Sequence, residues 1–181
     1  MTEELEVVKE VVQRLDKGGI AYMITGSTAA NFYTVPRMTR DIDIVVELLE
    51  RDVERFIRLF ENDYYLEPET VRGAVKNKGM FNLIHDEYII KIDFVVRKDS
   101  PYRAREFSRR NKVAVDDQDL YLVSPEDLIL SKLEWAKDSR SEVQLSDVRN
   151  LLKDVKGLNR RYLTRWAKAL GVEALYREVR R

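Results

Sequence analysis

The sequence predicts an α/β (α+β) protein, in which a mixed β-sheet is flanked by helices and followed by a helical C-terminal portion. Residues 2–17 carry apolar side chains at the spacing of an amphipathic helix, and short apolar runs of strand length, such as residues 20–24, follow. From Ser124 onward, one helical pattern follows another. At 181 residues, with 44% apolar and 35% charged, the chain is long enough for one sizeable core. We expect an α/β core over residues 1–123, with residues 124–181 packed on it.

The order of the predicted elements follows from apolar periodicity and from turn and capping residues. Gly18-Gly19 ends the first helix, and Ser27 is placed to cap a short helix. Ser100-Pro101 and Ser124-Pro125 are typical helix starts, in which a capping serine precedes proline. The predicted helices are residues 2–17, 29–33, 50–62, 125–137, 142–155, 160–169 and 172–179, with another beginning at Pro101, and the predicted strands are residues 20–24, 42–46, 80–84, 88–96, 112–115 and 120–123.

The composition excludes several kinds of chemistry. There is no cysteine, so disulfides, thiolate metal sites and cysteine nucleophiles are excluded. One histidine, His85, excludes a metal site built from several imidazoles of one chain. Catalysis must therefore rest on carboxylates, lysine, arginine and hydroxyl groups. His85 lies in a predicted turn and is expected to be exposed, whereas Trp135, Trp166 and Tyr64-Tyr65 are expected in the core.

No apolar run approaches the ~18 residues of a membrane-spanning helix. The N-terminus is acidic and leads into an amphipathic stretch, unlike a secretory signal. We therefore expect a cytoplasmic protein without a membrane partner.

The tripeptide Asp41-Ile42-Asp43 is the most informative segment. Residues two apart on a strand point to the same face, so Ile42 is expected in the core and both aspartates outside it. Two adjacent carboxylates repel each other unless a cation lies between them, and Mg²⁺ takes oxygen ligands of this kind. Asp93 lies in a run apolar enough to be a central strand, where an unpaired acid is costly. Three carboxylates on adjacent strands can hold two metal ions about 4 Å apart for phosphoryl transfer; solvated acids on an edge strand are the alternative.

Residues near this segment are suited to phosphate. Gly26-Ser27 lies at a predicted strand-to-helix turn, where backbone N–H groups and the helix dipole can bind an anion. Arg37 and Arg40 precede Asp41, and arginine suits bidentate phosphate contacts. Because Arg40 is adjacent to Asp41 on the chain, it is expected to face away and to be structural.

Taken in order, these segments resemble the signature of the DNA polymerase β-like nucleotidyltransferase superfamily. That signature is a Gly-Ser turn, an Asp-x-Asp strand and a third carboxylate on a later strand, here Gly26-Ser27, Asp41-Ile42-Asp43 and Asp93. The form Arg-x-Thr-x-Asp-Ile-Asp looks similar to the abortive-infection and toxin–antitoxin nucleotidyltransferases and their uncharacterised relatives. A later serine-proline helix start, a helical lysine and an acid on the next helix are also similar. The resemblance spans about residues 20–150, although Asn31, Phe32 and Tyr33 replace the small residues of many relatives.

The resemblance implies a nucleotidyltransferase fold and a metal-dependent enzyme. Such an enzyme transfers a nucleoside monophosphate from a nucleoside triphosphate, such as ATP, to an acceptor hydroxyl and releases pyrophosphate. It implies Mg²⁺ or Mn²⁺ bound by Asp41, Asp43 and Asp93, with Asp93 also helping to deprotonate the acceptor. The nucleotide-binding residues that it implies are Gly26, Ser27, Arg37, Thr39, Lys132 and Asp147.

Charge is distributed unevenly although the formal net charge is zero. Residues 1–100 have 14 basic and 19 acidic residues, and residues 101–181 have 18 and 13. Arg161, Arg165 and Lys168 share one helix face. These basic C-terminal helices suggest RNA, specifically tRNA, as the acceptor; a solvated surface is the alternative.

Other functions stay open at this stage. Proteins and small molecules such as aminoglycosides are also acceptors in the superfamily that the chain resembles. A non-catalytic nucleotidyltransferase-fold binding module is one alternative function. A toxin-like protein held by an antitoxin partner is another.

Overall fold

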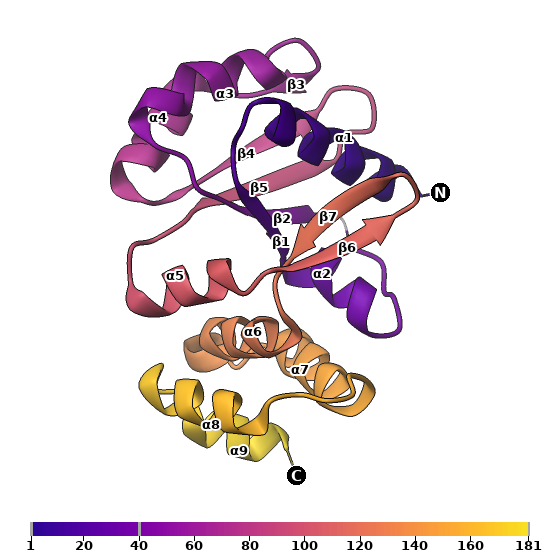
Figure 1. Cartoon of the computed structure of the whole chain (residues 1–181), viewed down its shortest axis with the longest axis vertical. Coiled ribbons are helices and arrows are strands. Elements are labelled where there is room, and N and C mark those ends of the chain that lie inside the picture. Colours follow the sequence, from indigo (N-terminus) through magenta and orange to yellow (C-terminus); the bar gives the residue numbers. More distant parts are fainter. Residues whose placement is uncertain (1, 40, 181) are drawn as a thin grey trace.

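A mixed β-sheet forms the centre of the molecule (Figure 1). The computed structural model describes residues 2–39 and 41–180, so the structural role expected for Arg40 lies outside the described residues. The strands are β1 (Tyr22–Thr25), β2 (Asp41–Val46), β3 (Tyr64–Tyr65), β4 (Met80–His85), β5 (Lys91–Val96), β6 (Asn111–Val115) and β7 (Gln118–Leu122). Within the described residues they form one sheet in the order β3-β4-β5-β2-β1-β7-β6. The pairs β2–β5 and β1–β7 are parallel and the others antiparallel, so the predicted fold class is confirmed.

Helices cover the sheet and make up the C-terminal portion. They are α1 (Glu3–Lys17), α2 (Gly26–Tyr33), the short 3-10 helix η1 (Glu50–Asp52), α3 (Val53–Phe60), α4 (Pro68–Asn77), α5 (Pro101–Ser108), α6 (Pro125–Ser139), α7 (Glu142–Asp154), α8 (Arg160–Ala169) and α9 (Glu173–Val179). In Figure 1, α6 to α9 gather at the opposite end of the molecule from α3 and α4. No helix among the described residues is long and apolar enough to cross a membrane.

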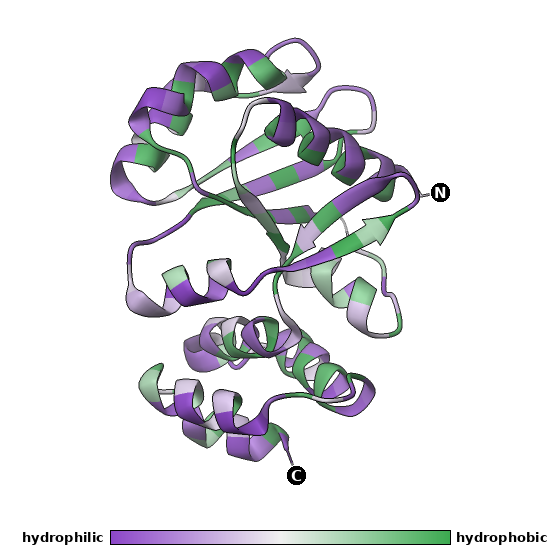
Figure 2. Cartoon of the chain, in the orientation of Figure 1, coloured by the Kyte–Doolittle hydropathy of each residue, from purple (hydrophilic) through white to green (hydrophobic). Residues whose placement is uncertain are grey.

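The two faces of the central strands differ in polarity. Ile42 of β2 and Phe94 of β5 are buried on one face, where the ring centroid of Phe94 lies 5.2 Å from that of Phe56 on α3. Asp43 and Asp93 point to the other face, beside residues of α6. This alternation appears as green and purple bands along the strands in Figure 2. It follows from the two-residue period of a strand.

A network of buried polar residues joins the C-terminal helices to α5. Ser124 caps α6 as predicted, since its Oγ accepts a hydrogen bond from the Asp127 backbone N–H at 3.2 Å. The fully buried Asp127 carboxylate accepts hydrogen bonds from Arg109 at 3.0 Å and from the Tyr162 hydroxyl at 2.7 Å. These contacts pack α5, α6 and α8 together.

Several local predictions were wrong, each for a local reason. Ser27 does not cap α2, because the helix already begins at Gly26 and Thr25 is its N-cap residue. β5 begins at Lys91 rather than at residue 88, because Ile89 takes a positive φ of 53° in the preceding turn. β3 and α4 were not predicted, since β3 is only two residues long and glycine interrupts the apolar pattern of α4.

The predicted burial of three aromatic side chains, His85, Trp135 and Tyr65, was also wrong. His85 is buried, with 5% of its surface exposed, because Tyr64 of β3 packs against its ring; its Nδ1 accepts hydrogen bonds from the backbone N–H groups that close the turn. Trp135 and Tyr65 are each 64% exposed, whereas Tyr64 is in the core as expected. Trp166 is partly buried and packs against the core.

Candidate active site

Two aspartates face each other across parallel strands at the centre of the sheet. In the β2–β5 register, Asp43 lies opposite Asp93, and Asp41 lies opposite Lys91. Residues two apart on a strand share a face, so all four side chains lie on the face that α6 overlies. The structure therefore brings the three predicted acidic residues to one face and adds Lys91 to them.

The turn between β1 and α2 lies directly against Asp43. Gly26 has a φ of +62°, and a Cβ at this position would lie 2.0 Å from Asp43 Oδ2. Only glycine fits there, because a side chain would be strained and would also overlap the carboxylate. Thr25 is paired with Asp43 in the β1–β2 register and makes no side-chain capping hydrogen bond to α2. The first N–H groups of α2 thus lie beside the carboxylates. These N–H groups and the helix dipole would stabilise an anion bound at the start of α2.

The electrostatic setting of Asp43 favours a cation. Burial raises the pKa of the Asp43 carboxyl above its usual value, and the neighbouring Asp93 and Asp41 add to the effect. Lys132 and Lys91 act in the opposite direction but do not cancel it. The negative charge is therefore held at a cost that a bound divalent cation would reduce.

Lys91, which was not among the predicted site residues, lies between two of these carboxylates. Its Nζ is 2.8 Å from Asp93 Oδ2 and 3.8 Å from Asp41 Oδ2. The hydrogen bond with Asp93 raises the pKa of Lys91, so the ammonium is charged at neutral pH. Across residues 2–39 and 41–180, no three acidic or histidine groups converge as a ready metal site. The signal available in the sequence was the position of Lys91, two residues before Asp93 on the same strand face.

Arg37, Lys132 and Ser27 are joined through Asp147. The Arg37 guanidinium donates two hydrogen bonds to Asp147, at 3.0 Å from Nε and 2.9 Å from Nη2, and a third to Ser27 Oγ at 2.6 Å. Lys132 Nζ donates to Asp147 Oδ2 at 2.8 Å and to Gln144 Oε1 at 3.0 Å. Burial acts to raise the pKa of Asp147, but the hydrogen bonds from Arg37 and Lys132 outweigh it and hold the pKa below the usual value. Four of the predicted nucleotide-binding residues thus form one network, which links α2, the loop after it, α6 and α7.

Thr39 is not part of this network. Its hydroxyl donates to the Asp41 backbone carbonyl at 3.1 Å. It therefore holds the start of β2 rather than facing Lys132 or Asp147.

A cleft runs between the sheet and α6. Its inner part, about 210 Å³, is lined by Asp43, Asp93, Lys132 and Gln144 among others. A neighbouring cavity of about 680 Å³ shares Trp135 with it. Sequence reasoning missed Trp135 and Gln144 as cleft residues, because the spacing of residues on a helix does not show which face a cleft uses.

The fold matches solved structures of nucleotidyltransferase-like proteins. An antigenic nucleotidyltransferase-like protein from Paracoccidioides brasiliensis has a TM-score of 0.60 at 17% sequence identity, with 98% of this chain and 92% of that chain covered. The lincomycin-bound lincosamide antibiotic adenylyltransferase LnuA gives 0.57 at 16% identity, with 86% and 99% covered. ANT(2")-Ia in complex with adenylyl-2"-tobramycin gives 0.57 at 14% identity, with 99% and 98% covered.

These likenesses establish a nucleotidyltransferase-like fold and nothing finer. No protein-family model matches the chain, and no curated protein matches it either. The resemblance to abortive-infection and toxin–antitoxin proteins therefore receives no support from the comparisons.

Proposed function

We propose that the chain is a metal-dependent nucleotidyltransferase, which transfers a nucleoside monophosphate from a nucleoside triphosphate to an acceptor hydroxyl and releases pyrophosphate. The observation that carries this proposal is the pairing of Asp43 with Asp93 across β2 and β5, directly beside the start of α2. A carboxylate pair that favours a cation lies next to a helix N-terminus that favours an anion. That combination suits a triphosphate accompanied by its metal ion.

The oxygen donors of the acidic residues suit a divalent cation, Mg²⁺ or Mn²⁺, although among the described residues no three of them converge as a ready site. Asp41, Asp43 and Asp93 would hold it, since their oxygens are the donors that such ions prefer and Gly26 leaves no Cβ in the space beside Asp43. When bound, the ion would neutralise phosphate charge and make the acceptor hydroxyl more acidic. The Asp93 carboxylate would accept the proton of that hydroxyl.

The remaining residues of the network would bind the triphosphate. The backbone N–H groups of Gly26 and Ser27 would hold the β- and γ-phosphates. Lys132 would contact a phosphate from the opposite side of the inner cleft, which it shares with Asp43. Asp147 would orient Lys132 and Arg37, both of which it already binds.

The activity can be tested with triphosphates labelled at the α-phosphate. The chain is incubated with each triphosphate and Mg²⁺, together with total RNA, with protein or with small-molecule extracts, and both pyrophosphate release and the labelled pool are measured. Pyrophosphate release that disappears in Asp43→Asn and Asp93→Asn would support the proposal. Triphosphate binding without pyrophosphate release in any mixture would favour the non-catalytic binding module.

Two surfaces favour different acceptors. Arg161, Arg165 and Lys168 are all exposed on α8 and would suit an RNA backbone. In that case RNA binding weakens steeply with salt, and reversing the three residues to Glu reduces RNA labelling. Reversing three exposed basic residues elsewhere, Arg51, Arg58 and Lys76, is the matched control.

The exposed Trp135 beside the larger cavity instead favours a small acceptor that contains a ring. Trp135→Ala would then lower labelling of the small-molecule pool and leave RNA labelling unchanged. A protein partner of the antitoxin kind is also proposed, but we assign no surface of the chain to it.

A further inference from the structure

One cation lies among the acidic residues of the candidate active site. Lys91 is opposite Asp41 in the β2–β5 register and two residues before Asp93 on its own strand. The backbone therefore places its side chain on the face that carries both carboxylates. Its Nζ lies 2.8 Å from Asp93 Oδ2 and 3.8 Å from Asp41 Oδ2. The ammonium thus bridges two carboxylates that belong to neighbouring strands.

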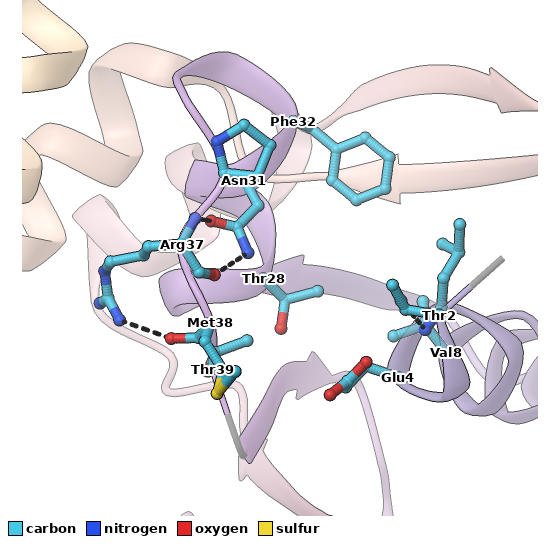
Figure 3. Close-up of a pocket in the computed structure, with 11 residues that line it drawn as sticks. Thr2, Glu4, Val8, Thr28, Asn31, Phe32, Arg37, Met38 and Thr39 are labelled. Atoms are coloured by element: carbon cyan, nitrogen blue, oxygen red, sulfur yellow. Dashed lines mark hydrogen bonds between the residues drawn. The ribbon is translucent and has the colours of Figure 1, made fainter.

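The other cations near the site are held elsewhere. The Arg37 guanidinium and the Lys132 ammonium both bind Asp147. Figure 3 shows Arg37 in the loop after α2, where the Asn31 amide exchanges hydrogen bonds of 2.8 and 3.0 Å with its backbone. Among the described residues, Lys91 is the one cation that forms ion pairs with the strand aspartates.

The two aspartates that face each other across β2 and β5 therefore have different surroundings, although both line the inner cleft. Asp93 is paired with Lys91 and is 16% exposed. Asp43 forms no ion pair within residues 2–39 and 41–180, and it lies against Gly26 at the start of α2. Asp43 is thus available to a metal ion on the side where the triphosphate would bind, whereas Asp93 already has a cation.

A second metal ion at Asp93 would meet this ammonium. An Mg²⁺ ion lies about 2 Å from a carboxylate oxygen that it binds, and two cations at one carboxylate repel each other. The three strand aspartates carry three negative charges, which one divalent ion and the Lys91 ammonium together balance. Within the described part of the chain, the acidic residues also do not gather into a ready metal site, as two shared ions would require.

We infer that Lys91 takes the place of a second metal ion, so that the site uses one divalent ion, which arrives with the triphosphate, and one ammonium. Lys91 would hold the Asp93 carboxylate at Oδ2 and leave Oδ1 to accept the proton of the acceptor hydroxyl. The acceptor oxygen still bonds to the α-phosphorus while pyrophosphate leaves. Lys91 is therefore a positioning residue, since it acts through Asp93. This inference rests on the proposed function.

The test counts bound Mn²⁺ ions by electron paramagnetic resonance, in the presence of analogues of ATP, GTP, CTP and UTP with an uncleavable methylene group between the α- and β-phosphates. The full chain should bind one Mn²⁺, with the spectrum of an isolated ion. Lys91→Gln should bind two, and its spectrum should be broadened as for ions about 4 Å apart. Lys91→Arg, which keeps the charge, should bind one, as should Lys98→Gln, an exposed control.

Lys91→Gln combined with Asp93→Asn should return to one ion, because the second ion loses its carboxylate. Two neighbouring Mn²⁺ ions in the natural chain would overturn the inference and leave the proposed function standing, and so would a single ion in Lys91→Gln. Absence of bound Mn²⁺ in the natural chain with every analogue would overturn the proposed function and the inference with it.

Discussion

Lys132 and Asp147 form a buried ion pair between α6 and α7, with Nζ 2.8 Å from Oδ2 and side chains only 3% and 7% exposed. Arg37 binds the same carboxylate from the loop after α2. Asp147 therefore holds both the Lys132 ammonium and the Arg37 guanidinium in place. Because Arg37 also donates a hydrogen bond to Ser27, these contacts connect the C-terminal helices to the turn at the start of α2.

Asp147→Asn should destabilise the protein by roughly 3–5 kcal/mol, because it leaves the buried Lys132 ammonium without its counter-charge. Urea denaturation measures this loss. Asp154→Asn is the control, since Asp154 is exposed on the same helix and should change stability by about 0.5 kcal/mol or less. Equal stability of Asp147→Asn and the natural chain would show that the pair is not needed for folding.

The contribution of Asp147 should depend on pH in a defined direction. Its pKa is lowered in the folded state from the usual 3.8, so the stabilisation is present above 3.8 and disappears as the pH falls through the lowered value. The difference in unfolding free energy between the natural chain and Asp147→Asn should therefore shrink in acid. Measuring both proteins over a pH series checks this, and a difference that grows in acid would contradict it.

Asp43→Asn should stabilise the metal-free protein by about 1 kcal/mol at neutral pH. The pKa of Asp43 is raised in the folded state, so ionisation destabilises the fold as pH rises from 3.8 through the raised value. Thermal unfolding with and without Mg²⁺ is the measurement. Mg²⁺ should raise the Tm of the natural chain and of Asp86→Asn, an exposed control, but not that of Asp43→Asn. A Tm that responds equally to Mg²⁺ in all three proteins would place the metal elsewhere.

Gly26→Ala should destabilise the protein more than Gly19→Ala. Both glycines have a positive φ, +62° and +64°, so both variants carry the strain of about 1–2 kcal/mol for a side chain in that region. Only at Gly26 does the new Cβ also meet Asp43 Oδ2, whereas nothing lies within 4 Å at Gly19. Chemical denaturation compares the two variants. Equal losses of stability in the two variants would mean that the Asp43 carboxylate moves aside freely.

Lys91→Gln should bind Mg²⁺ about fivefold more tightly than the natural chain. The Lys91 ammonium lies beside Asp93 and Asp41, so it competes with a metal ion for them. The pair with Asp93 is partly exposed, and we take its worth as about 1 kcal/mol, the upper end for a surface ion pair. Calorimetric titration with Mg²⁺ alone measures the change. Lys98→Gln is the exposed control. Weaker Mg²⁺ binding in Lys91→Gln would instead make Lys91 a supporting residue of the site.

Local chemistry explains which features the sequence could predict. The alternation of Asp41, Ile42 and Asp43 needs only the two-residue period of a strand, and Ser124 caps α6 through residues three positions away. β3 was missed because two residues carry too little pattern. His85 was misjudged because its burial depends on β3, whose Tyr64 packs edge-on against the imidazole at 4.8 Å between ring centroids.

The sequence by itself determined the class of fold, the face on which the strand aspartates lie and the chemistry available without cysteine. The tertiary structure alone decided that Lys91 lies between two carboxylates and that Trp135 is left exposed beside a cavity. The physical reason is the distance along the chain over which each interaction acts. Strand period and helix caps act over a few neighbouring residues, whereas Arg37 and Asp147 are 110 positions apart and meet only when α2 and α7 pack together.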